Sequence, residues 1–115
     1  MTQNNLGNGL MTLGVRTGGR AGLALLGRAV AAYEAALSVT SEVATPAIWA
    51  TRQENIAITR FAMAGICEEP LPELYRAETA ALSALRVYTP EHMPYYHEKA
   101  SELLVDIRAA IAALP

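Results

Sequence analysis

The glycine-rich segment "GVRTGGRA" (14–21) fits the spacing of a phosphate-binding loop, with two glycines five residues apart and a basic residue directly after the second. Such a loop needs a lysine that reaches the phosphates, a serine or threonine that holds Mg²⁺, and a strand before it. Arg20 stands in place of the lysine, Ala21 replaces the hydroxyl residue, and no strand is predicted upstream. We therefore interpret the segment as a flexible connection between two helices.

A second set of side chains has the chemistry of metal ligands: Cys67, Glu91, His92, His97 and Glu98. Zinc ligands usually come in close pairs such as C-x2-C or H-x3-H. The two histidines are five residues apart with a proline between them, and the single cysteine has no partner thiol. We expect no metal site in this chain.

Signals of a catalytic centre are weak. No serine lies in a G-x-S-x-G elbow, and Cys67 has no neighbouring basic residue that would favour its thiolate. Glu68 and Glu69 are adjacent on a predicted loop, so their carboxylates face different directions, as in a solvated charge run. We expect no enzyme activity, no catalytic residue and no cofactor.

Length and composition indicate one helical domain. The chain has 115 residues, of which 52% are apolar and 17% charged, and this balance excludes a disordered protein. The net charge of −2 argues against nucleic acid or an anionic membrane as partner, because both select basic surfaces. No run of 18 apolar residues exists, so no membrane span is predicted. A single cysteine favours a reducing compartment, and we expect the cytoplasm.

Apolar residues recur at helical spacing almost everywhere, and alternating β patterns are nearly absent. Leu26, Val30 and Tyr33, for example, step by three or four residues along one helix face. Thr45 followed by Pro46 is typical of a helix start. The sequence predicts five helices, over residues 2–14, 21–41, 46–64, 71–88 and 94–113. Because the connections are short, sequential helices should pack antiparallel.

The chain is also similar to itself at an offset of 48 to 50 residues. An offset of 50 places Gln, Asn, Leu and Gly at positions 3, 5, 6 and 7 on Gln, Asn, Ile and Ala at 53, 55, 56 and 57. An offset of 48 places "AALSVTSEVATP" (35–46) on "SALRVYTPEHMP" (83–94). A helix pair is therefore repeated. We expect two units, about 1–45 and 46–93, followed by a closing helix at 94–113.

The second helix of the first unit has a small, a large and a small residue at fixed spacing, Ala29, Tyr33 and Ala36, and the second unit has Ala77, Ala81 and Ala84 there, without the large central residue. The first helix carries Leu6–Gly7, which becomes Ile56–Ala57 one unit later. Together with "TQNNLGNGLMTLG" and "AVAAYEAALSVTSEVATPAIWA", these patterns resemble tetratricopeptide-repeat proteins, in particular a long-repeat branch found in bacterial proteins. The resemblance implies a single domain over residues 1–115, an all-α solenoid of stacked antiparallel helix pairs.

The resemblance also implies a non-catalytic module that binds a peptide or a partner domain on its concave face, which the first helix of each unit lines. The positions assigned to this face are Asn4, Asn8, Met11, Thr51, Glu54, Ile58, Phe61, Glu102 and Asp106. Side-chain amides can both donate and accept hydrogen bonds to a peptide backbone, and the three acidic residues favour basic or amide-rich segments. Equally, Asn4 and Asn8 could serve only to join neighbouring helices.

A second interpretation is an independent helical bundle that self-associates and binds a small ligand between its helices. The residues that precede Gln53 have no counterparts before Gln3, so either the first helix begins inside a longer repeat array or a short helix simply begins at the terminus. The former leaves an uncovered apolar face, made of Leu6, Leu10, Leu13 and Tyr33. Two copies of the chain could associate through this face.

Overall fold

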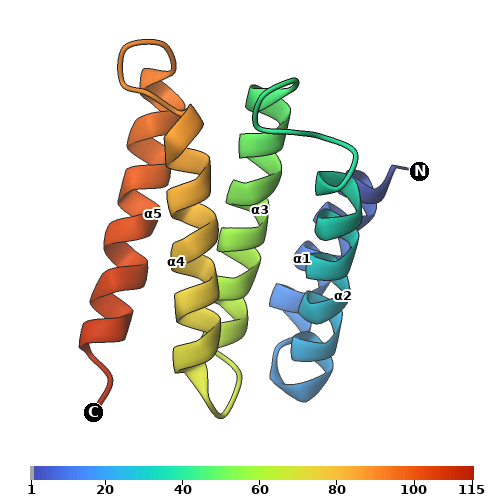
Figure 1. The fold of residues 1–115 in the computed structure, drawn as a ribbon. Helices are drawn as coiled ribbons and strands as arrows, with labels where there is room; N and C mark the ends of the chain where they lie inside the picture. Colours follow the sequence, from blue (N-terminus) through green and yellow to red (C-terminus); the bar gives the residue numbers. More distant parts are fainter. Residues whose placement is uncertain (1) are drawn as a thin grey trace.

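The computed structural model describes residues 2–115, which form five α-helices and no β-strand (Figure 1). The helices are α1 (Gln3–Thr17), α2 (Gly19–Leu37), α3 (Pro46–Ala64), α4 (Pro70–Val87) and α5 (Pro94–Ala112). Successive helices run in opposite directions and lie side by side (Figure 1). The predicted all-α class with five helices is confirmed.

Local chemistry explains where the helices begin. Pro46, Pro70 and Pro94 each open a helix, at a position where the missing N–H of proline costs no hydrogen bond. Thr2 caps α1, because its hydroxyl oxygen accepts a hydrogen bond from the Asn5 amide at 3.2 Å. Thr2 therefore precedes the first helix instead of forming its first residue.

The connection predicted within residues 14–21 is much shorter than expected. Only Gly18 separates α1 from α2, and Gly18 and Gly19 have φ angles of +63° and +60°, which favour glycine. Gly14 and Gly22 lie inside the helices, where a Cβ on Gly22 would come within 2.6 Å of the Gly14 carbonyl oxygen. These two glycines let the backbones of α1 and α2 touch, so the segment is a tight helical hairpin rather than a flexible loop.

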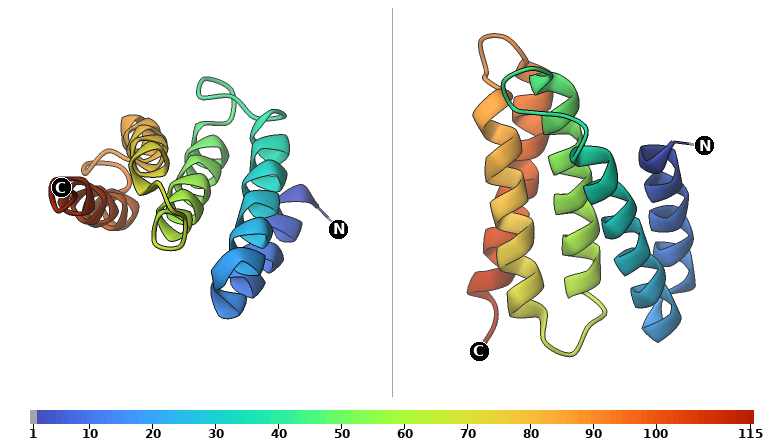
Figure 2. Two further views of the ribbon diagram at one scale, coloured as in Figure 1. Left: turned by 90° about the horizontal axis from the view of Figure 1, so that it is seen from below. Right: turned by 45° about the vertical axis from the view of Figure 1, so that its right-hand side comes forward.

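The five helices form an open row and do not close into a ring. Within residues 2–115, each helix packs on the next, α3 also touches α1 and α5, and the backbones of α1 and α5, and of α2 and α4, do not come close to each other. The helices thus form two layers, α1, α3 and α5 in one and α2 and α4 in the other. The molecule is a flat slab of 38 × 37 × 19 Å, with α1 and α5 at its two edges (Figure 2).

The core between the layers is built mainly from small residues and two tyrosines. All six positions of the repeated helix pattern are buried: Ala29, Tyr33, Ala36, Ala77, Ala81 and Ala84. Gly7 lies so close to the Tyr33 ring that a Cβ there would be 2.7 Å from a ring carbon. Tyr88, directly after α4, is also fully buried. Small residues at these positions allow close helix approach, and a large side chain from one helix fills the space beside them.

The apolar face predicted at the α1 edge is only partly exposed. Leu6 and Leu13 are 37% and 52% exposed, but Leu10 and Tyr33 are buried. Tyr33 is covered because Gly7 leaves room for its ring beneath α1. The exposed apolar surface at this edge is therefore smaller than the four residues suggest. None of the helices in the part of the chain that the structure describes is long and apolar enough to span a bilayer.

Candidate functional site

Four of the nine predicted surface positions meet in one hollow between α3 and α5, the acidic cleft. Its walls consist of Glu54, Ile58, Lys99, Glu102, Leu103 and Asp106, and its volume is about 230 Å³. The α5 residues share one side of that helix, because steps of three and four residues return to the same face. Glu54 and Ile58 are likewise one turn apart on α3. Positions that are 48 residues apart in the sequence, which is the offset of the repeat, thus line the same hollow in the structure.

Glu54 is the buried charge of the acidic cleft, with only 3% of its surface exposed. Its Oε1 accepts a hydrogen bond from the Tyr88 hydroxyl at 3.4 Å. Its Oε2 has no hydrogen-bond partner among residues 2–115. A buried carboxylate without its full set of donors is costly, and native proteins rarely contain one without a reason. The Oε2 oxygen therefore marks a place where a donor from outside the chain could bind.

Tyr88 holds Glu54 from the opposite layer. Its hydroxyl lies 3.0 Å from the Thr51 hydroxyl as well as near Glu54, and its ring stacks on Tyr96 with 5.2 Å between centroids. Burial, and to a smaller extent the negative charge of Glu54, raises the pKa of Tyr88 to about 12. Tyr88 therefore stays protonated at neutral pH and remains a hydrogen-bond donor.

Among residues 2–115, Lys99 supplies the one positive charge that lines the acidic cleft. Its Nζ lies 3.7 Å from Glu54 Oε2, close enough for an ion pair but too far for a hydrogen bond, and its side chain is 46% exposed. Three carboxylates and this single ammonium group line the cleft, so two of its negative charges are in excess. Sequence reasoning missed Lys99, although its spacing of three residues from Glu102 places both on one face of a helix.

The two predicted amides make contacts between helices. The Asn8 Oδ1 accepts a hydrogen bond from the Tyr33 hydroxyl, joining α1 to α2. The Asn4 Oδ1 accepts one from Asn55 Nδ2 at 3.3 Å, joining α1 to α3. Asn4 also lines a second hollow on this face together with Thr51, with a volume of about 240 Å³. Contact of either amide with a partner stays a prediction.

The remaining predicted positions differ in how much surface they offer. Met11 and Phe61 are half-buried and pack against the core, and the Thr59 hydroxyl donates to the Met11 sulfur at 3.2 Å. Thr51 is exposed and lies one turn before Glu54 on α3, so it connects the second hollow with the acidic cleft. Met11 and Phe61 therefore act mainly in packing, while Thr51 is part of the open face.

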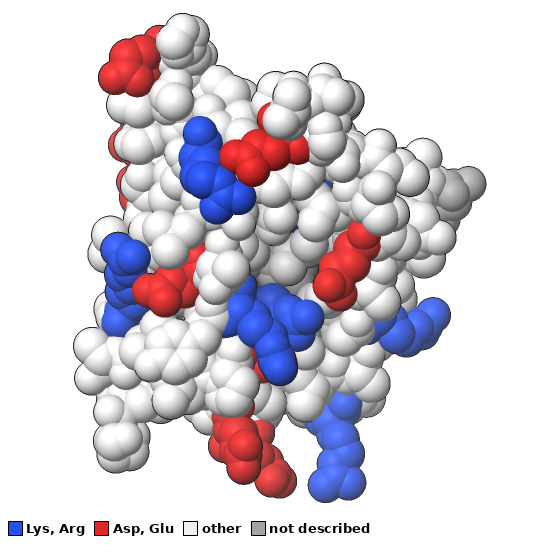
Figure 3. All heavy atoms as spheres, in the orientation of Figure 1, with Lys and Arg blue, Asp and Glu red and all other residues white. Residues whose placement is uncertain are grey.

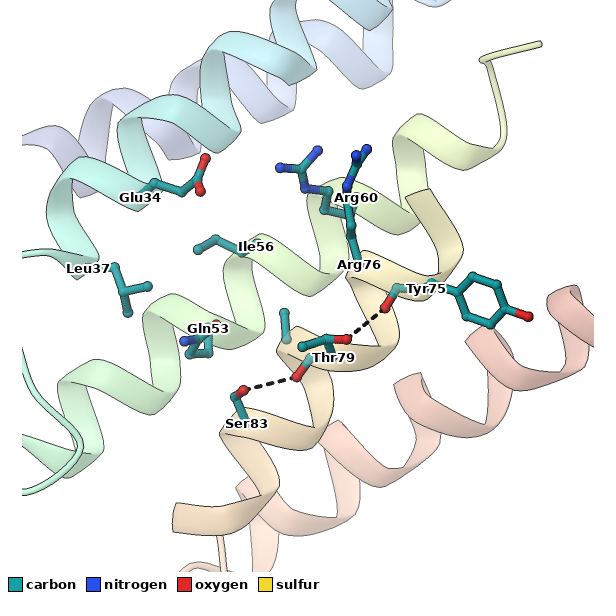
Figure 4. A pocket seen from close by; sticks show the side chains of 10 residues that line it. Glu34, Leu37, Gln53, Ile56, Arg60, Tyr75, Arg76, Thr79 and Ser83 are labelled. Atoms are coloured by element: carbon teal, nitrogen blue, oxygen red, sulfur yellow. Dashed lines mark hydrogen bonds between the residues drawn. The ribbon is translucent and has the colours of Figure 1, made fainter. Parts of the chain in front are cut away.

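A larger groove, not expected from the sequence, lies on the opposite face between α2 and α4, with α3 as its floor (Figure 4). This polar groove has a volume of about 430 Å³ and is lined by Glu34, Leu37, Gln53, Ile56, Arg60, Tyr75, Arg76, Thr79, Ala80 and Ser83. Figure 3 shows the same face, where basic side chains gather near the middle with acidic ones around them. Charges of both signs thus line this groove.

Most polar groups of the polar groove already have partners within the protein. Arg60 and Arg76 lie side by side (Figure 4), and both bind Glu73, at 3.0 and 2.8 Å. The Thr79 and Ser83 hydroxyls donate to backbone carbonyls of α4. The Arg76–Glu73 pair could have been recognised from its spacing, but Arg60 joins it only through the fold. Because these groups already have partners, the polar groove is a weaker candidate for ligand binding than the acidic cleft.

The residues considered as metal ligands lie apart. The α3–α4 connection, which contains Cys67, and the α4–α5 connection, which contains His92, lie at opposite ends of helix α4 (Figure 1). The His97 Nδ1 lies 2.8 Å from the Tyr88 carbonyl oxygen and is engaged there. Within residues 2–115, no group of three or more histidine, cysteine or acidic side chains is placed to hold a metal ion.

Comparisons with known proteins add no relative to these observations. No protein-family model, no curated protein and no solved structure matches this chain. The resemblance to tetratricopeptide repeats therefore rests on the sequence patterns, and the candidate site rests on its own geometry.

Proposed function

We propose that this protein is a non-catalytic interaction module that binds a peptide, or an extended segment of a partner domain, along the face of α1, α3 and α5. The observation that carries the proposal is the acidic cleft, where side chains from α3 and α5 converge around the buried carboxylate of Glu54. The open row supports it, because no helix of residues 2–115 covers this face. The resemblance to tetratricopeptide repeats points to the same face.

The two hollows on this face suit different parts of an extended peptide. The hollow between α1 and α3 offers the amide of Asn4 and the hydroxyl of Thr51, which can pair with backbone groups. The acidic cleft lies one turn further along α3 and suits a basic side chain. The single Cys67, a half-buried free thiol, agrees with a reducing compartment such as the cytoplasm.

Peptide display against the purified protein tests the proposal. We expect selected peptides to bind with micromolar affinity and to shift the amide NMR resonances of α3 and α5 on the α1/α3/α5 face. A display that yields no peptide binder contradicts the proposal, and so do binders whose shifts map to the polar groove between α2 and α4. A turnover screen for hydrolase activity should be negative.

Self-association through the α1 edge is a second candidate function, and one observation favours it. A groove of about 350 Å³ runs between α1 and α2 at this edge, lined by Gln3, Leu6, Leu10, Arg28, Ala31, Ala32 and Ala35. Leu13, three residues after Leu10 on α1 and 52% exposed, adds apolar surface to the same edge. Sedimentation equilibrium should show a dimer that Leu13→Glu weakens and that Val105→Glu, at the opposite edge, leaves intact. A monomer at every concentration excludes this function.

A further inference from the structure

The acidic cleft contains a negative charge that the chain itself does not fully compensate. We propose that it binds the guanidinium group of an arginine side chain of the partner, and that Lys99 takes the place of this group in the free protein. This inference rests on the proposed function, because the arginine belongs to the bound peptide. It adds the chemical class of the side chain that the cleft selects.

The need for a cation follows from Glu54. Glu54 lines the cleft but is only 3% exposed, and its buried Oε2 lacks a hydrogen-bond donor among residues 2–115. Glu102 and Asp106 line the same cleft from α5 and are both exposed. An incoming cation would therefore donate to a fixed, desolvated oxygen and meet two further carboxylates at the rim. A hydrogen bond to a buried charged group is stronger than one between neutral groups.

The shape of the cleft favours a guanidinium over a metal ion. The part of the chain that the structure describes holds no group of three acidic, histidine or cysteine side chains placed for metal binding, so the negative charge is spread along the walls. A guanidinium is planar, carries five N–H donors and is more weakly hydrated than an ammonium group. Ile58 and Leu103 supply apolar wall for the aliphatic stem of such a side chain.

Lys99 has the properties of a replaceable occupant. Its Nζ stays 3.7 Å from Glu54 Oε2, beyond hydrogen-bond distance, while its side chain is 46% exposed. The same nitrogen lies 5.9 Å from the centroid of the Tyr95 ring, which can hold it when it leaves Glu54. Half-exposed ion pairs of this kind are weak. A partner's arginine can therefore displace Lys99 at little cost.

The test uses three acetylated and amidated tripeptides, Gly-Arg-Gly, Gly-citrulline-Gly and Gly-Lys-Gly, titrated into the full chain and followed by amide NMR shifts. Citrulline has the shape of arginine but no charge. We expect Gly-Arg-Gly to shift α3 and α5 resonances around the acidic cleft, Gly-Lys-Gly to do so more weakly, and Gly-citrulline-Gly to have no effect.

Three variants assign the effect to the cleft. Glu54→Gln should raise the Kd for Gly-Arg-Gly by about tenfold or more, the loss of one charge-assisted hydrogen bond. Lys99→Met should lower this Kd by about two- to fivefold, the range set by a half-exposed ion pair. Glu34→Gln, an exposed carboxylate of the polar groove on the opposite face, should leave it unchanged. Thermal unfolding of each variant shows that it is folded.

Several results would overturn the inference. Equal Kd values for the citrulline and arginine peptides would show that charge plays no role. A lower Kd for the lysine peptide would show that the cleft does not prefer a guanidinium group. An unchanged or higher Kd in Lys99→Met would show that Lys99 does not take the place of the guanidinium group in the free protein. If millimolar Gly-Arg-Gly shifts no amide resonance around the acidic cleft in either the wild type or Lys99→Met, the site is refuted. Failure of the proposed function looks different, because peptide display then yields no binder while Gly-Arg-Gly still shifts the cleft.

Discussion

Two buried tyrosines connect the layers of this protein, and each ends on a polar side chain of the other layer. Tyr33 of α2 donates to the Oδ1 of Asn8 on α1. Tyr88, after α4, donates to the Oε1 of Glu54 on α3. Both rings are fully buried, so each helix pair uses the same device, an aromatic ring in the core with its hydroxyl at the α1/α3/α5 layer.

The acceptors of the two hydroxyls differ in charge and exposure. Asn8 is neutral and exposed, so water can satisfy the rest of its amide. Glu54 is charged and 3% exposed, and its second oxygen has only the distant ammonium of Lys99 beside it. The contact between Tyr33 and Asn8 is complete within the chain. The contact between Tyr88 and Glu54 leaves a charged oxygen that a donor from outside the chain could bind. This contrast separates a structural contact from a candidate binding site.

The largest effect is expected where the first tyrosine is packed most tightly. Gly7→Ala places a Cβ 2.7 Å from a ring carbon of Tyr33, which is fully buried. We expect the free energy of unfolding to fall by about 2 to 3 kcal/mol, as for other overpacked cores. Gly9→Ala, on the same helix with nothing within 4 Å, should raise it by up to about 1 kcal/mol. Urea unfolding of both variants compares them directly, and equal effects would contradict the packing.

Removing the hydroxyls one at a time sharpens the comparison. Tyr88→Phe takes the donor from a buried carboxylate and should lower the free energy of unfolding by about 1 to 2 kcal/mol. Tyr33→Phe frees only the exposed amide of Asn8 and should cost about 0.5 to 1 kcal/mol. Urea unfolding at neutral pH measures both. A larger loss in Tyr33→Phe would mean that the two acceptors have been assigned to the wrong roles.

Alkaline pH should lower the stability by a smaller amount and gradually, through the same two tyrosines. Burial raises the pKa of Tyr88 from 10 to about 12 and also raises the pKa of Tyr33. A hydroxyl with a higher pKa in the folded chain stabilises the fold fully below pH 10, and this stability is lost as the pH rises towards 12. Unfolding followed by circular dichroism should show that the stability of the wild type falls over that pH range. The stability of Tyr88→Phe should fall with a shallower slope. Equal slopes would place the titration elsewhere.

Much of the fold could be predicted from the sequence, because prolines and apolar periodicity act locally. Helix α3 was predicted to the residue, and α5 to within one residue at its C-terminal end, since Pro46 and Pro94 fix their starts. The hairpin at Gly18 was missed, because close backbone contact between Gly14 and Gly22 is a tertiary effect. The early end of α2, at Leu37 rather than 41, was missed as well.

The candidate site was predicted in part. The repeat offset brought Glu54 and Ile58 together with Glu102 and Asp106, because equivalent positions of stacked helices share a face. The burial of Glu54 and its contact with Tyr88 could not be foreseen, since they depend on side chains 34 residues apart. The polar groove was missed for the same reason.

Measuring stability and peptide affinity together in Tyr33→Phe and Glu54→Gln tests the central contrast most directly, with an arginine peptide from the display as ligand. The account predicts that Tyr33→Phe loses stability but keeps its Kd, while Glu54→Gln keeps its stability within about 1 kcal/mol, because a buried charge is removed, and loses affinity tenfold or more. The reverse pattern, with Glu54→Gln unfolding easily and binding normally, would show that Glu54 is structural and would contradict the account.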